Sequence, residues 1–201
     1  MIRPFKEKPR LSDNYEDEAW SKLQLAIDAI VSKQPTDFGR EELYGMVENI
    51  CIHKKGARLY QRLHVECERH VAAHLEQLQL RSRCMGNDEA FLAVVERAWA
   101  DFCNMVLTIR SIFLYLDRSY VIHTPGLRSI WDSGLDIFRE HLRRCDAVED
   151  KITSTLLATV ARERHGEHVN QTLLRSILRM LSALEVGSAR WERAGMLIFL
   201  Q

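Results

Sequence analysis

Apolar side chains recur every three or four residues along most of the chain, which is the spacing of one face of an α-helix. In the first half this pattern predicts helices over about Tyr15 to Ser32, about Arg40 to Lys54, a long stretch after Gly56, and Glu89 to Tyr120. No stretch alternates apolar and polar residues between turn signals, as a half-buried β-strand would. The pattern therefore predicts an all-α fold.

The segment from Glu89 to Tyr120 has apolar residues on two of its sides. A bend near Trp99 would divide it into two successive helices. One side carries Phe91, Val95, Ala98, Phe102, Met105, Ile109, Ile112, Leu116 and Tyr120, and the other carries Asn104, Leu107, Ser111, Leu114, Tyr115 and Arg118. A helix that is apolar on two sides is either buried all round or binds a partner, and the pattern alone leaves both open.

A strong turn signal, Thr124-Pro125-Gly126, divides the chain near its middle. Three further helices are predicted after it, over about 129–143, 146–164 and 170–184, with His165-Gly166 ending the second of them. The predicted organisation is an extended segment at 1–14, a complete bundle of about five helices at 15–122, an incomplete second bundle at 127–186, and a divergent apolar tail at 187–201.

Composition narrows the possible partners. The 201 residues are 46% hydrophobic and 28% charged, which is enough to bury a core. Lys+Arg and Asp+Glu number 28 each, so no basic excess favours nucleic acid or an anionic membrane. No window reaches the about 18 consecutive apolar residues of a membrane span. Five cysteines without a CxxC pair and no secretory segment predict a reducing compartment, the nucleus or cytoplasm.

Few residues suggest catalysis or metal binding. Glycine-rich phosphate loops and a nucleophile elbow are absent, so we expect no catalytic residue and no cofactor. Cys67, His70 and His74 share one helical stripe, and three such ligands could hold zinc in a helical metalloenzyme. The metalloprotease motif needs a glutamate directly after the first histidine, however, and Val71 stands there. Packed side chains are the favoured interpretation, and a metal site is not expected.

Three stretches carry more distinctive residues. They are Glu41-Glu42-Leu43-Tyr44 with Val47-Glu48-Asn49, then Ile109-Arg110-Ser111-Ile112-Phe113-Leu114-Tyr115-Leu116-Asp117-Arg118-Ser119-Tyr120-Val121, then Arg162-Glu163-Arg164-His165-Gly166-Glu167 with Leu173-Leu174-Arg175-Ser176. In this order they resemble the N-terminal region of cullins, over residues 14–184. The stretch 3–15, the pair Ala19-Trp20 and the run 129–135 are most similar to type-4 cullins.

The resemblance implies an elongated stalk of tandem cullin repeats, each a five-helix bundle, and a non-catalytic scaffold of a ubiquitin ligase complex. For type-4 cullins the partner is an adaptor, the large damaged-DNA-binding protein built of β-propellers, which links substrate receptors to ubiquitin-dependent degradation. The region that recruits the RING subunit is missing here, so we expect a truncated chain that binds the adaptor and not the RING subunit. Direct binding to nucleic acid or membrane is not expected.

In cullins the second and fifth helices of the first repeat form the adaptor surface, which the resemblance transfers to matching positions here. The predicted surface comprises Glu41, Tyr44, Gly45, Glu48 and Ile52, together with Asn104, Leu107, Ser111, Leu114, Tyr115 and Arg118. Phe5 and Leu11 are expected to anchor the N-terminal extension on the adaptor. Tyr44 and Tyr115 are the predicted anchors, because tyrosine is enriched at binding hot spots. Either tyrosine could instead simply cover the bundle. An unrelated helical tethering protein is the alternative function.

Overall fold

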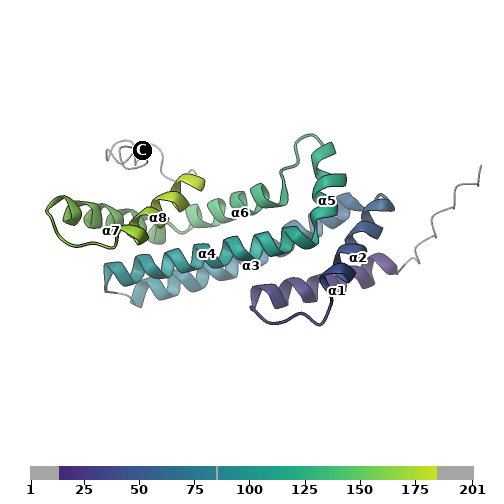
Figure 1. The fold of residues 1–201 in the computed structure, drawn as a ribbon, viewed down its shortest axis with the longest axis horizontal. Coiled ribbons are helices and arrows are strands. Elements are labelled where there is room, and N and C mark those ends of the chain that lie inside the picture. The colour runs from purple at the N-terminus through teal and green to yellow at the C-terminus, as the bar shows by residue number, and fades with distance from the viewer. Residues whose placement is uncertain (1–13, 85, 185–201) are drawn as a thin grey trace, which may run out of the picture. The chain divides into compact units, whose positions relative to one another are not determined.

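The computed structural model describes residues 14–84 and 86–184, without the side chains of 82–84. The described residues form eight α-helices and one short 3-10 helix, and contain no strand (Figure 1). The elements are α1 (Tyr15–Val31), α2 (Arg40–Ile52), α3 (Gly56–Cys84), α4 (Asp88–Ile112), α5 (Leu114–Ser119), η1 (Val121–His123), α6 (Ile130–Arg144), α7 (Asp146–Arg164) and α8 (Gln171–Ala183). The predicted all-α fold is confirmed. Residues 1–13 of the predicted extension and the whole predicted tail lie outside the described residues.

A side chain caps the start of α4. The Asn87 side chain accepts hydrogen bonds from the backbone N–H groups of Glu89 and Ala90, at 3.0 and 3.3 Å. Asn87 therefore caps α4, a role that a short polar side chain just before the first turn can fill. Asp88 is the first helical residue, where its negative charge interacts favourably with the positive end of the helix dipole.

The break in the long predicted segment is at Phe113, and the prediction of a bend near Trp99 is wrong. Trp99 lies inside α4, and its ring is 5.5 Å from that of Phe102 and 5.4 Å from that of Phe138, measured between centroids. Phe113 has φ −91° and ψ 17°, outside the helical region, and is fully buried. Packing of the large Phe113 ring in the core therefore coincides with the change in chain direction.

The described residues divide into two compact units. The first contains residues 14–63 and 108–127, and the second contains residues 64–84, 86–107 and 128–184. The helices α3 and α4 each contribute to both. The domain boundaries predicted from the sequence, 15–122 and 127–186, remain a prediction.

Charged residues join α1 to the start of α3 within the first unit. The Arg62 guanidinium donates a hydrogen bond to the Asp17 carboxylate, and this bond holds the pKa of Asp17 below its usual value. Glu16 pairs with Arg58 at 3.3 Å and with Lys55 at 3.6 Å. The acidic first turn of α1 is therefore linked by ion pairs to basic residues just before and within the first two turns of α3.

Aromatic side chains fill the core of the second unit. The ring centroids of Phe102 and Phe138 are 4.6 Å apart, which brings α4 and α6 together. Gly134 of α6 faces Val106, and a Cβ atom at position 134 would lie 3.2 Å from both Val106 methyl groups. The absence of a side chain at Gly134 thus permits the close approach of these two helices.

Burial makes three thiols weakly acidic. Removal from water raises the pKa of Cys67 to about 12, with a further rise from the Glu66 carboxylate, and it raises the pKa of Cys51 and of Cys103 to about 11. Because the thiolate is the nucleophile, such groups are poor catalytic candidates. None of the helices in the described part of the chain combines the length and the apolar character that a membrane span requires.

We expect Cys51, Cys67 and Cys103 to be almost inert in the folded chain. With pKa values of about 11 to 12, no more than about one thiol in a thousand is ionised at pH 8. Alkylation with iodoacetamide, mapped peptide by peptide by mass spectrometry, should label these three positions much more slowly in the folded chain than in denaturant. Rapid labelling of Cys67 under native conditions would contradict its burial.

Gly56→Ala is expected to destabilise the first unit. A Cβ atom at position 56 would lie 2.9 Å from Cγ of Tyr120, near the rigid base of that ring, so overpacking should lower the free energy of unfolding by about 1 to 3 kcal/mol. Gly45→Ala is the matched control, since nothing lies within 4 Å of its added Cβ. Denaturant unfolding should show Gly45→Ala raising stability by up to about 1 kcal/mol. Equal effects of the two changes would contradict the packing of Tyr120 on α3.

Candidate protein interface

The α2 helix has one buried face and one accessible face. Its buried residues are Leu43, Met46, Val47 and Ile50. The predicted interface residues of α2 are not among the buried ones: Glu41 is exposed, and Tyr44, Gly45, Glu48 and Ile52 are partly exposed. The helix therefore offers a mixed polar and apolar face to a partner.

The predicted residues of the later segment are also accessible. Ser111 and Arg118 are exposed, and Leu114 and Tyr115 are partly exposed, all within the first unit. Asn104 and Leu107 are exposed as well, Leu107 to 49%, but they belong to the second unit. Phe5 and Leu11 lie outside the described residues.

The helices α2 and α5 pack against each other, and the two predicted anchors meet where they do so. The rings of Tyr44 and Tyr115 contact edge to face, with centroids 6.3 Å apart and planes at 87°. In this geometry the electropositive edge of one ring meets the electronegative face of the other, which is a favourable interaction. A hydroxyl on α5 adds a local contact, because Ser119 donates a hydrogen bond to the backbone carbonyl of Tyr115 at 2.6 Å. The two tyrosines therefore form one aromatic patch that is neither buried nor fully exposed.

Around the aromatic patch lie charged side chains and an open position. Glu41 and Glu48 of α2 supply negative charge, and Arg118 of α5 supplies positive charge. Gly45 has no atom within 4 Å of where a Cβ would stand, so the backbone of α2 is open to approach there. Aromatic anchors with a charged rim are features of protein interfaces. We use "α2–α5 face" below for the first-unit residues Glu41, Tyr44, Gly45, Glu48, Ile52, Ser111, Leu114, Tyr115 and Arg118.

Two features beside this face were missed by sequence reasoning. Ile122 of η1 is 75% exposed, directly after α5. Asp117 of α5 is buried and pairs with Arg110 of α4, with Nε and Oδ2 3.2 Å apart. An aspartate inside an apolar run, seven residues after an arginine, was the only signal for this pair in the sequence.

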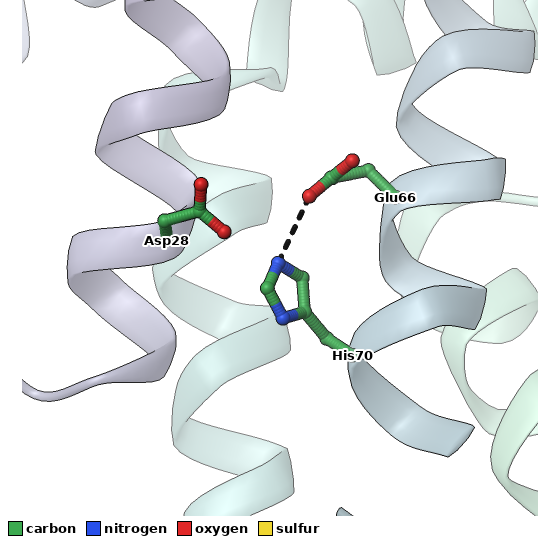
Figure 2. A group of neighbouring side chains, drawn as sticks. All are labelled: Asp28, Glu66 and His70. Atoms are coloured by element: carbon green, nitrogen blue, oxygen red, sulfur yellow. Dashed lines mark ion pairs between the residues drawn. The ribbon is translucent and has the colours of Figure 1, made fainter. Parts of the chain in front are cut away.

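The trio Cys67, His70 and His74 is not brought together as a metal site. Among the described residues, these three do not form a group whose ligand atoms lie within 4.8 Å of one another. His70 instead pairs with Glu66 on the preceding turn of α3, Nε2 to Oε1 at 3.0 Å (Figure 2). The side chains of Glu66 and His70 are only 7% and 10% exposed, and Arg69 also pairs with Glu66. Asp28, also drawn in Figure 2, belongs to α1 in the first unit.

Comparison with known proteins identifies the family. The family model of the cullin alpha solenoid domain matches residues 20–194. The chain is 43% identical to Cullin-4A of Mus musculus over 192 residues, which are 96% of this chain and 25% of that protein. It is 40% identical to Cullin-4 of Dictyostelium discoideum over 189 residues, 92% of this chain and 23% of that protein.

Type-3 relatives are less similar. Cullin-3 of Dictyostelium discoideum is 31% identical over 175 residues, 87% of this chain and 22% of that protein. The chain thus spans about a quarter of the length of the curated relatives it matches. Since the family model covers most of its residues, the chain belongs to the cullin family and is more similar to these type-4 members than to this type-3 member.

Proposed function

We propose that this chain is an adaptor-binding scaffold segment of a cullin-RING ubiquitin ligase. Its partner is the β-propeller damaged-DNA-binding adaptor, bound through the α2–α5 face. The observation that carries this proposal is the accessible Tyr44–Tyr115 patch at the positions matching the family's adaptor-binding helices. Similarity to the type-4 relatives supports the choice of this adaptor over those of other cullins.

The chemistry of the α2–α5 face supports binding and not catalysis. Its side chains offer tyrosine rings, an open glycine backbone and a rim of both charge signs. Such a face gains affinity from burying the aromatic centre and orientation from the charged edge. Transfer of ubiquitin is thus assigned to other subunits, and the role of this chain is to hold the adaptor. The proposed site of action is the nucleus or the cytoplasm, or both.

Family membership also bears on the alternative functions. An unrelated tethering protein would share helical rods but not the match to the cullin alpha solenoid domain over residues 20–194. A metalloenzyme built on Cys67, His70 and His74 has no support from their geometry. Scaffolding therefore remains the function with support from both the residues and the relatives.

The double variant Tyr44→Ala, Tyr115→Ala is expected to bind the adaptor at least about thirty-fold more weakly than the wild type. The reason is that aromatic anchors at hot spots each contribute about 2 kcal/mol or more. Titration calorimetry with the purified propeller adaptor is the measurement.

Leu25→Ala is the matched control for this experiment. Leu25 is 60% exposed on α1, in the same unit but outside the α2–α5 face, so its loss should leave affinity unchanged. If the wild type binds and the double variant binds equally well, the family assignment stands but the anchors are wrong. If a folded wild type fails to bind at all, adaptor binding by this chain is refuted.

Gly45→Arg tests the same face by adding bulk instead of removing it. Because Gly45 has open space beside it and arginine is a better helix former than glycine, the variant should fold with no loss of thermal stability. The added side chain should obstruct the partner and weaken adaptor binding at least about tenfold. Gly39→Ala, which also has nothing within 4 Å of its Cβ, should not affect binding. Full affinity of Gly45→Arg would place the interface elsewhere.

A further inference from the structure

The short helix α5 needs outside contacts to keep its shape. It has six residues, Leu114–Ser119, whereas isolated helices shorter than about 12 residues are marginal in water. It nevertheless carries Tyr115, which contacts Tyr44 across the α2–α5 face. Whatever fixes the orientation of α5 therefore also fixes the geometry of that aromatic patch.

A buried charge lies at the centre of α5. Asp117 is one of the few charged residues buried among the described residues, with 6% of its area exposed. A buried carboxylate is tolerated only where partners compensate its lost hydration. One such partner is Arg110, whose Nε donates to Oδ2 at 3.2 Å, while 43% of the Arg110 side chain stays exposed. Asp117 has additional interactions besides this one.

The ion pair joins the two sides of the helix break. Arg110 lies in the last turn of α4 and Asp117 lies in α5, with the non-helical Phe113 between them. Ion pairs along a continuous helix join residues three or four apart. Residues seven apart are separated by about 10.5 Å along an unbroken helix axis. The Arg110–Asp117 pair therefore connects the end of α4 to α5 across the break at Phe113.

We infer that the Arg110–Asp117 ion pair is a positioning device that sets the angle of α5 after the Phe113 break and thereby presents Tyr115 to Tyr44. Its consequence for adaptor binding rests on the proposed function, but its effect on α5 is a property of the free chain. Neither residue is among the predicted contact residues. Both act through the orientation of Tyr115.

The test compares Arg110→Gln, Asp117→Asn and their combination in the 201-residue chain. Backbone amide exchange followed by mass spectrometry should show residues 114–119 exchanging at least about tenfold faster in either single variant. The increase should exceed any change in α1 of the same unit. Because one change already breaks the pair, the double variant should be no worse than Asp117→Asn alone. Arg110→Lys, which keeps the charge, should restore part of the protection.

The control breaks an ion pair in the second unit, away from the Phe113 break. Arg162 pairs with Glu167 at 2.7 Å, and both side chains are about half exposed, so Arg162→Gln should leave exchange at 114–119 unchanged. In calorimetry with the propeller adaptor, Arg110→Gln should weaken binding at least about tenfold and Arg162→Gln should not. Arg110→Gln is the decisive variant if Asp117→Asn does not fold, because Arg110 is the more exposed partner.

The outcomes separate the inference from the proposed function. Unchanged exchange at 114–119 in Arg110→Gln overturns the inference, as does an equal rise of exchange across the whole first unit, which would make the pair a general stabiliser. Additive effects in the double variant also overturn it. Faster exchange confined to α5, in a chain whose wild type does not bind the adaptor, supports the positioning role and refutes only the adaptor proposal.

Discussion

The packing of α2 against α5 is the contact on which the candidate interface depends, and it exists because the helix that begins at Asp88 stops before Phe113. A straight continuation would carry Tyr115 along the axis of α4. The break instead turns six residues against α2, where Leu116 is fully buried and Tyr115 stays partly exposed. The burial of Leu116 and the partial exposure of Tyr115 thus both follow from the change in backbone direction at Phe113.

The charged residues near the break are of two kinds. Some form buried contacts within the first unit, and others are accessible to a partner. The buried Asp117 and its partner Arg110 serve the internal arrangement of the first unit. Glu41, Glu48 and Arg118 are accessible and have the charge distribution of an interface rim. Accessible charges such as these add little to the stability of the fold, because exposed ion pairs contribute little to the free energy of unfolding. In the proposed function, these polar residues serve recognition of the adaptor.

The side chains of α3 that could have suggested a metal site or a reactive thiol have structural roles instead. Glu66 is buried and paired with His70 and Arg69 on neighbouring turns, which compensates its charge within one helix. Cys67 beside them is buried, and its pKa is raised to about 12, so it behaves as a small apolar residue. Helical spacing places these residues on one side of α3. Spacing alone does not show which of them pairs with a neighbouring side chain, as His70 does with Glu66.

Much of the fold was determined by the sequence alone. Helical periodicity predicted nearly every helix to within a few residues, because the spacing of apolar residues records which face is buried. The turn residues His165-Gly166 located the end of α7, and the motifs from Glu41 to Asn49 and from Ile109 to Val121 indicated the family. The tertiary structure decided where the long segment breaks, since Phe113 leaves the helix to pack in the core and no turn residue marks it. It also decided that Arg110 reaches Asp117 and that the rings of Tyr44 and Tyr115 touch. These contacts depend on the angle between helices, which periodicity along one helix does not encode.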